Sequence, residues 1–228
     1  MFIYNMVPFK TYLHDWKKVL LESDSGGNIE PASLRVLDFD HTVAYTPEMV
    51  MIKSPEGEIV DRLDSHRFAT HELSRNEIAA GYSYDFSEFD DVNEKETREN
   101  DHVVRILSNF INAPDPDSRI ILILTARNQE AESGIRRFFE TVGIPHDRIM
   151  VIGVGSSLPQ KKVDEVEKIL DENPSIDRVS FYDDSYKNVS QMVKFIKAYN
   201  TREKRSIDYD IALVNPKGKL VRPKGFRS

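Results

Sequence analysis

Short apolar runs alternate with helical patterns along most of this sequence, and that alternation restricts the chain to few folds. Five runs have the length and composition of buried β-strands, and each is preceded or followed by a stretch whose apolar residues have helical spacing. Strands joined by helices in this way form parallel sheets covered by helices. The sequence therefore predicts an α/β fold, a three-layer Rossmann-like parallel sheet. The five runs cover residues 33–40, 120–124, 149–154, 179–182 and 211–214.

Three segments between these runs carry apolar residues on one helix face. Gly143 is placed to end the first helix, Asn173-Pro174 stops the second, and Ser185 is placed to cap the third. A further helix is expected over residues 11–22, ahead of the sheet. The inward-facing positions of the three helices are Ala131, Ile135, Phe138, Phe139 and Val142, then Val163, Val166, Ile169 and Leu170, then Val189, Met192, Val193 and Ile196.

Composition excludes several kinds of chemistry. The chain has 228 residues and no cysteine, so it has no disulfide, thiolate metal site or cysteine nucleophile, and a metal site must use Asp, Glu or His. Its 38 acidic and 31 basic side chains give a net charge of -7, which repels phosphate-rich polymers except at a local basic patch. Pro8 and Lys10 interrupt the apolar start of the chain, so we expect no signal peptide, no membrane span and a cytoplasmic protein.

The regular alternation is interrupted in residues 44–92. Ser54-Pro55-Glu56-Gly57 is a turn signal between two apolar stretches and predicts a β-hairpin, and a short helix is expected at about residues 65–73. We interpret residues 44–92 as an inserted cap. The sheet domain then comprises residues 34–43 and 93–215, with a helix and linker in residues 1–33 before it and a basic tail in residues 216–228 after it.

Polar side chains follow the ends of three of the expected strands. Because side chains beyond the carboxyl ends of parallel strands meet in one crevice, we expect them to lie close together. A pair of lysines opens the helix before the fourth strand and is expected at the same edge. These candidate site residues are Asp38, Asp40, Thr125, Arg127, Lys161, Lys162, Asp183 and Asp184.

This set of residues favours phosphoryl transfer. Two carboxylates about 4 Å apart repel by roughly 4 kcal/mol near a protein surface, so a cation is expected to join them. An all-oxygen ligand set without cysteine favours a hard ion, and Mg²⁺ is the best match. Asp38 and Asp40 lie two apart on an extended chain and share one face. Asp38 can then attack phosphorus while Asp40 protonates the leaving oxygen, and a hydroxyl and a lysine hold the phosphoryl group.

The ordered set Asp38-x-Asp40-x-Thr42, Thr125, Lys161 or Lys162, and Asp183-Asp184 resembles the four signature motifs of the haloacid dehalogenase (HAD) superfamily of phosphohydrolases. A receiver domain has a similar inventory, but there the paired acids come first. The resemblance covers residues 34–214 and implies a small cap of the C1 type that selects the substrate. One departure is His41, where many members have glycine.

The resemblance also implies a role for each residue. Asp38 is the nucleophile and a magnesium ligand, and Asp40 is the acid/base and offers its backbone carbonyl to the ion. Asp183 is a further ligand, with Asp184 close by or linked through water. Thr125 and a lysine bind the phosphoryl group, and we favour Lys162 over Lys161 because apolar residues follow Lys162 at helical offsets.

A more distant likeness is to the phosphatase half of polynucleotide kinase-phosphatases and to small HAD proteins of bacteriophages. It rests on Leu124-Thr125-Ala126-Arg127 and on Asp183-Asp184-Ser185-Tyr186-Lys187-Asn188. By that likeness Arg127 contacts the substrate phosphate or the cap, and Asn188 braces the acidic loop. The expected partner is a phosphorylated small molecule or a polynucleotide end, and the sequence leaves the oligomeric state open.

Two other functions stay open from the sequence. One is a HAD-fold binding protein without catalytic activity, and the other is a nucleic-acid 3′-end phosphatase. The tail in residues 216–228 bears on the second, because it carries five basic residues and no acid and could neutralise phosphates. The tail is equally explained as a frayed terminus attracted to an acidic body, which is the interpretation we favour from sequence.

Overall fold

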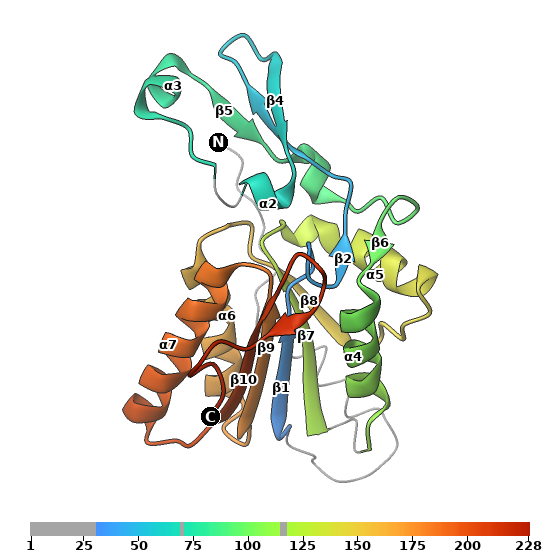
Figure 1. Ribbon diagram of the computed structural model, residues 1–228, viewed down its shortest axis with the longest axis vertical. Coiled ribbons are helices and arrows are strands. Elements are labelled where there is room, and N and C mark those ends of the chain that lie inside the picture. Colours follow the sequence, from blue (N-terminus) through green and yellow to red (C-terminus); the bar gives the residue numbers. More distant parts are fainter. Residues whose placement is uncertain (1–30, 69–70, 115–117) are drawn as a thin grey trace.

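The computed structural model describes residues 31–68, 71–114 and 118–228 (Figure 1). The helix expected over residues 11–22 lies outside the described residues. The described chain forms a central sheet with helices on both sides and a smaller unit above one end of it (Figure 1).

The central sheet has six strands in the order β11-β10-β9-β1-β7-β8. The five strands from β10 to β8 are parallel, and β11 runs antiparallel to β10. This confirms the expected α/β class and the parallel sheet. The strands are β1 (Ser33–Leu37), β7 (Arg119–Thr125), β8 (Ile149–Gly153), β9 (Arg178–Asp183), β10 (Asp208–Val214) and β11 (Leu220–Val221).

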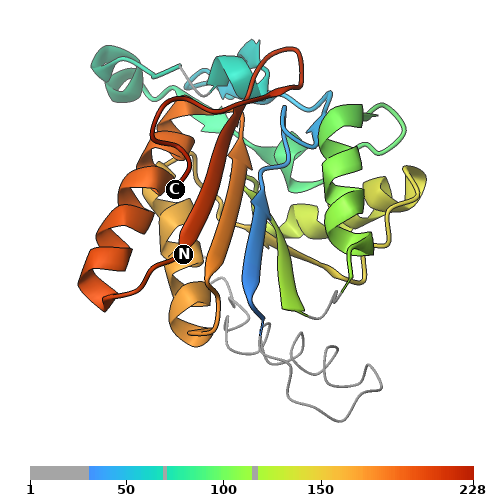
Figure 2. The same ribbon diagram turned by 60° about the horizontal axis from the view of Figure 1, so that its bottom comes forward.

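Four helices complete the three layers. α4 (Asp101–Asn112) and α5 (Glu132–Thr141) cover one face of the sheet, and α6 (Pro159–Glu172) and α7 (Tyr186–Glu203) cover the other (Figure 2). In α5, α6 and α7 the positions that the helical spacing placed inward are buried, except Val142, which is half-buried; Tyr199 of α7 is buried in addition. Each face of the sheet therefore has a core of its own.

The predicted helix ends are confirmed where they can be compared. Gly143 follows α5 with a φ of 69°, a left-handed conformation that glycine adopts without a Cβ clash. The hydroxyl of Ser185 accepts a hydrogen bond from the amide of Asn188 and so caps α7. α6 has Asn173 as its C-cap, directly before Pro174.

The inserted segment folds as a small unit, which we call the cap. Its sheet has the order β4-β3-β5 and contains the predicted hairpin. The short helix expected over residues 65–73 ends at Phe68, and a second one, α3, follows. The elements are β3 (Val50–Lys53), β4 (Ile59–Leu63), α2 (Ser65–Phe68), α3 (Arg75–Ala80), β5 (Ser83–Asp85) and a 3₁₀ turn at Ser87–Asp90.

Two short strands connect the cap to the sheet domain. β2 (Ala44–Tyr45) carries the chain out and β6 (Arg98–Glu99) brings it back, and the two pair antiparallel. Tyr84 and Phe89 pack inside the cap, Phe89 in its buried cluster and Tyr84 against it. They therefore belong to the local core of the cap, whereas Phe86 between them is exposed.

The basic tail is not frayed, and the interpretation as a loose terminus is wrong. β11 pairs with β10, and the amide of Ile211 donates to the carbonyl of Phe226 (2.9 Å). Arg222 pairs with Asp210 (2.6 Å), while the ring of Phe226 is buried in the core under α7. Backbone pairing and apolar burial hold the tail, which composition alone could not indicate.

Within the described residues, no helix has both the length and the apolar content that crossing a membrane requires.

Candidate active site

Three carboxylates gather where β1 and β9 end. The two strands are parallel neighbours with Leu37 opposite Tyr182, so the next residues, Asp38 and Asp183, come into register at the same edge. Asp184 follows directly, and oxygen atoms of the three aspartates all lie within 4.8 Å of one another. The sheet register thus brings together acids that are far apart in the sequence.

Lys162 is the cation within this group. Its Nζ lies 2.6 Å from Oδ1 of Asp38 and 2.8 Å from Oδ2 of Asp183, and its side chain is almost fully buried. Burial alone would lower the pKa of Lys162, but Asp183 and Asp38 raise it above the usual range, so the ammonium stays charged. Lys161 is exposed. The geometry therefore places Lys162, the residue favoured by helical offsets, at the carboxylates.

The loop after β9 holds Asp183 in position. The backbone amide of Ser185 donates to Oδ1 of Asp183 (2.8 Å), and the side-chain amide of Asn188 lies 3.0 Å from both of its carboxylate oxygens. Ser185 also caps α7, which sets the direction of that helix from the loop. Asn188 therefore braces the acidic loop, as the sequence suggested.

The cluster has more negative than positive charge. Three carboxylates against the single ammonium of Lys162 leave a formal charge of about -2 when all are ionised. Burial raises the pKa of Asp38 to about 7; Lys162 opposes this effect, and Asp183 adds to it. Burial, then Asp38 and Asp183, raise the pKa of Asp184 to about 9. Burial is the larger cause of both shifts, and the neighbouring carboxylates add to it.

The donor set fits a hard divalent cation. A dication balances the residual charge of the three carboxylates, and oxygen-only ligands are those that Mg²⁺ binds. Asp38, Asp183 and Asp184 would hold it. The expected contribution of the Asp40 backbone carbonyl stays a prediction.

The carboxylate of Asp40 is held by a different partner. Its Oδ2 accepts from Nε of Arg127 (2.9 Å), and its Oδ1 accepts from Nη2 of Arg127 (2.8 Å) and from the hydroxyl of Thr46 (2.7 Å). Burial alone would raise the pKa of Asp40, but Arg127 and Thr46 outweigh it and hold the pKa below its usual value. In this arrangement Asp40 is ionised.

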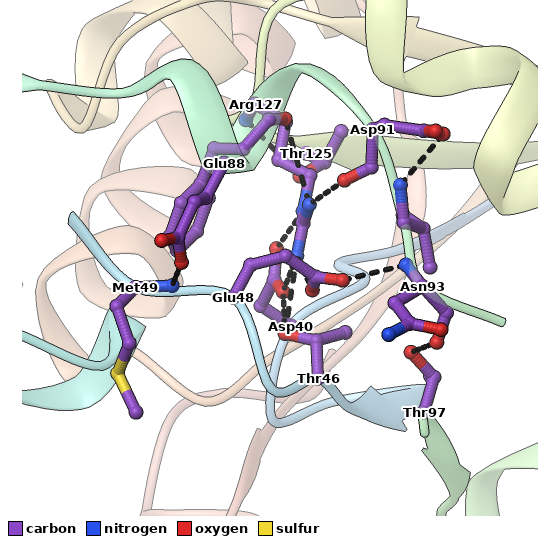
Figure 3. A network of polar contacts seen from close by, with 12 residues as sticks. Asp40, Thr46, Glu48, Met49, Glu88, Asp91, Asn93, Thr97, Thr125 and Arg127 are labelled. Atoms are coloured by element: carbon purple, nitrogen blue, oxygen red, sulfur yellow. Dashed lines mark hydrogen bonds and ion pairs between the residues drawn. The ribbon is translucent and has the colours of Figure 1, made fainter. Parts of the chain in front are cut away.

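Arg127 also binds residues of the cap. Besides Asp40, its guanidinium donates to Oε2 of Glu48 (2.9 Å) and to the carbonyl of Asp91 (2.6 Å) (Figure 3). Of the two expected roles for Arg127, contact with the cap is therefore the one observed. Its donors are engaged in these contacts, and its assignment to the substrate phosphate stays a prediction.

Thr125 and His41 lie at the same edge of the sheet. Thr125 ends β7 and is buried, and its hydroxyl accepts from the backbone amide of Arg127 (3.2 Å). Its role in phosphate binding stays a prediction. His41 has a φ of 55° in the tight turn after Asp40, a left-handed conformation that histidine adopts more often than most residues and glycine adopts freely.

Sequence reasoning missed three polar residues around the site. Glu48 and Thr46 both bind Arg127, and Asn100 donates to the carbonyls of Thr42 (2.9 Å) and Gly218 (3.2 Å). Glu48 carried a weak signal, because it directly precedes the apolar run that begins at Met49, and an acid is buried only with a partner. Nothing in the sequence pointed to Thr46 or Asn100.

Comparison with models of protein families, with curated proteins and with solved structures gave no match to this chain.

Proposed function

We propose that this protein is a Mg²⁺-dependent phosphomonoester hydrolase of the HAD type, with Asp38 as the nucleophile. The observation that carries the proposal is the position of Lys162, whose ammonium bridges Asp38 and Asp183 in a buried cluster of three carboxylates. A nucleophilic carboxylate, an acidic metal-ligand set and a fixed cation are the parts that phosphoryl transfer needs.

In the first step the Asp38 carboxylate attacks phosphorus, and the bond from phosphorus to the leaving oxygen breaks. The phosphoryl group is then an acyl phosphate on Asp38. Lys162 and Thr125 hold its oxygens and offset their charge. Magnesium, when bound, screens the charge between the attacking carboxylate and the phosphate.

Asp40 is assigned the two proton transfers. It gives a proton to the leaving alcohol and later takes one from the water that hydrolyses the acyl phosphate. The ionised carboxylate that Arg127 holds is the form required for the second transfer. The first transfer requires a protonated Asp40, for which its pairing with Arg127 has to loosen.

A phosphatase assay with a broad panel of phosphomonoesters and Mg²⁺ tests the proposal. We expect turnover by the wild type and none by Asp38→Asn, which keeps the shape but removes the nucleophile. Lys161→Ala, an exposed change beside Lys162, is the control and should leave turnover unchanged. Persistent turnover in Asp38→Asn would contradict the mechanism, and no turnover by the wild type on the whole panel would favour a binding protein without catalytic activity.

A second candidate function is a nucleic-acid 3′-end phosphatase. It is favoured by the position of the basic tail, residues 216–228, which pairs with the central sheet through β11. Asn100 ties Gly218, in the turn between β10 and β11, to the loop that follows Asp40. The exposed Lys217 and Lys219 flank that glycine. This function predicts salt-sensitive binding of 3′-phosphorylated oligonucleotides that weakens in a Lys217→Ala/Lys219→Ala double variant and not in Lys194→Ala, an exposed change on α7.

A further inference from the structure

Arg127 contacts the two parts of the molecule at once. On the side of the sheet domain it binds both carboxylate oxygens of Asp40. On the side of the cap it binds Oε2 of Glu48 (2.9 Å) and the carbonyls of Asp91 (2.6 Å) and Phe89 (3.4 Å) (Figure 3). The residue itself lies in the sheet domain, two positions after Thr125, the last residue of β7.

The surroundings of Arg127 make these contacts strong. Its side chain is fully buried, and those of Asp40 and Glu48 are nearly so. The guanidinium also stacks over the ring of Phe89, 4.5 Å from its centroid. Charged hydrogen bonds shielded from water are stronger than exposed ones, and removing one partner leaves a buried charge without compensation.

The contacts of Glu48 extend the connection into the cap. Its Oε1 accepts from the backbone amide of Asn93 (2.6 Å), and the neighbouring amide of Met49 donates to Glu88 (3.0 Å). These two hydrogen bonds join the segment that leaves the sheet domain, with Glu48 and Met49, to the segment that returns to it, with Glu88 and Asn93. The junction lies where Arg127 binds Glu48. Displacement of the cap removes acceptors from Arg127, and displacement of Arg127 releases the carboxylate of Asp40.

We propose that Arg127 is a positioning residue that orients Asp40 and fixes the cap to the sheet domain, so that the cap's position controls the proton-transfer carboxylate. The catalytic part of this inference rests on the proposed phosphatase function. The coupling itself rests on the contacts of Arg127 alone, and it can be measured without a substrate.

Hydrogen exchange of the substrate-free protein tests the coupling. The reporters are the amides of Met49 and Asn93, and the variants are Asp40→Asn, Arg127→Lys and Glu48→Gln. We expect exchange at both reporters to rise at least about tenfold in Asp40→Asn, although Asp40 lies outside the cap. The amide of Val166, in α6, should not change, which separates loss of coupling from general destabilisation.

Arg137 provides a matched control. It also binds Asp91 (2.7 Å), but on the surface, where both side chains are well exposed, and exposed ion pairs contribute little. Arg137→Lys should therefore leave exchange at Met49 and Asn93 as in the wild type. Unchanged exchange in Asp40→Asn, or an equal rise in Arg137→Lys, would overturn the coupling.

The leaving group of the substrate tests the positioning role. An alkyl phosphate needs a proton on its leaving oxygen, whereas p-nitrophenyl phosphate has a leaving group that departs as an anion. General acid catalysis contributes about 10² to 10⁴ in rate. We expect kcat/KM of Arg127→Lys to fall at least about tenfold more on the alkyl phosphate than on p-nitrophenyl phosphate, as it should in Asp40→Asn.

Two other outcomes are informative. An equal loss on both substrates, with weaker inhibition by inorganic phosphate, would overturn the positioning role and assign Arg127 to phosphate binding. If the wild type hydrolyses neither substrate, the proposed function fails, while hydrogen exchange still decides whether Arg127 couples Asp40 to the cap.

Discussion

The ammonium of Lys162 lies 2.6 Å from a carboxylate oxygen of Asp38, in a site where both side chains are almost fully buried. The two residues are 124 positions apart in the sequence, and they meet because the start of α6 and the end of β1 share one edge of the sheet. An ion pair shielded from water in this way fixes the position of the carboxylate. Within the described residues, the other oxygen of Asp38 has no ammonium contact.

Removing the ammonium should reduce stability and abolish turnover. Lys162→Met leaves Asp38 and Asp183 buried without a cation, which we expect to lower the free energy of unfolding by about 3 kcal/mol at pH 8. The loss should shrink at pH 5, because protonation relieves the repulsion. Chemical denaturation at both pH values measures it.

Lys161→Met is the matched control for this prediction. Lys161 is exposed in the same helical turn, so its substitution should change stability by less than about 0.5 kcal/mol. Equal effects of the two substitutions would contradict the assignment of Lys162 to the carboxylates.

Stability of the metal-free protein should fall as pH rises. The pKa is about 7 for Asp38 and about 9 for Asp184 in the folded protein. Both carboxyl groups therefore keep protons that they release at about pH 4 in the unfolded chain. Folding therefore takes up protons, and its free energy becomes less favourable between about pH 5 and 9. Thermal unfolding in the presence of a chelator should show this decline, and Asp184→Asn should flatten it. A metal-free protein more stable at pH 8.5 than at pH 6 would contradict these pKa shifts.

Magnesium should reverse this trend. Binding requires ionised carboxylates, so the ion displaces protons from Asp38 and Asp184 and binds more tightly as pH rises. We expect the stabilisation by Mg²⁺ to be larger at pH 8.5 than at pH 6. Calorimetry in two buffers of different ionisation enthalpy should detect proton release at pH 7, and an affinity independent of pH would argue against ligation by these aspartates.

Asn188 should tune metal binding without touching the metal. Its side-chain amide lies 3.0 Å from both oxygens of Asp183, and residues that orient a ligand contribute about 10- to 100-fold in metal affinity. We expect Asn188→Ala to weaken Mg²⁺ binding at least about tenfold in a calorimetric titration. Lys187→Ala, an exposed change one residue earlier, should have no effect; weakening by both variants alike would point to the helix as a whole.

Gly218 should be intolerant of a side chain. It has a φ of 71°, and a Cβ there would lie 2.7 Å from Oδ1 of Asn100 and 2.8 Å from the hydroxyl of Tyr45. Gly143 has a φ of 69° and nothing within 4 Å of its Cβ position. Both Gly→Ala changes carry the conformational cost of about 1 kcal/mol.

Comparing the two Gly→Ala substitutions separates the cost of backbone strain, which both share, from the cost of a steric clash, which only Gly218 has. Gly218→Ala should cost at least about 1 kcal/mol more in unfolding free energy than Gly143→Ala, because Asn100 or the hairpin turn must move. Equal costs would mean that the turn between β10 and β11 is not packed against the loop after Asp40.

The sheet and the carboxylate cluster could be predicted from sequence because both follow from short-range patterns. A buried parallel strand appears in the sequence as a continuous apolar run. The residue that follows the run lies at the carboxyl edge of the sheet, and this predicts the positions of Asp38 and Asp183. Lys162 was separable from Lys161 because helical offsets determine which of two neighbours faces inward.

The individual partners of Arg127 other than Asp40 could not be predicted, because they come from the inserted segment. Glu48 and Thr46 reach Arg127 only through the path of the inserted segment, and no periodicity encodes that path. The helix α3 did carry a signal that sequence reasoning passed over. Ser74 and Glu77 form a capping box three residues apart, and Gly81 ends the helix.

The tail shows why composition misleads near a terminus. Its terminal position and basic charge favoured a frayed segment attracted to an acidic body, but Asn215-Pro216-Lys217-Gly218 between the apolar end of β10 and Leu220–Val221 is a hairpin signal. The charge of a side chain does not indicate whether the backbone of that residue pairs with a neighbouring strand.

A crystal structure of the protein with Mg²⁺ and beryllium fluoride would show which residue accepts the phosphoryl group. Beryllium fluoride bound to a carboxylate has the shape of a phosphoryl group on that residue. We expect beryllium fluoride on Asp38, with a magnesium ion held by Asp38 and Asp183 and with the ammonium of Lys162 contacting the fluorides. Beryllium fluoride absent from Asp38 at saturating concentration, or a magnesium ion bound away from Asp38, Asp183 and Asp184, would contradict the proposed mechanism.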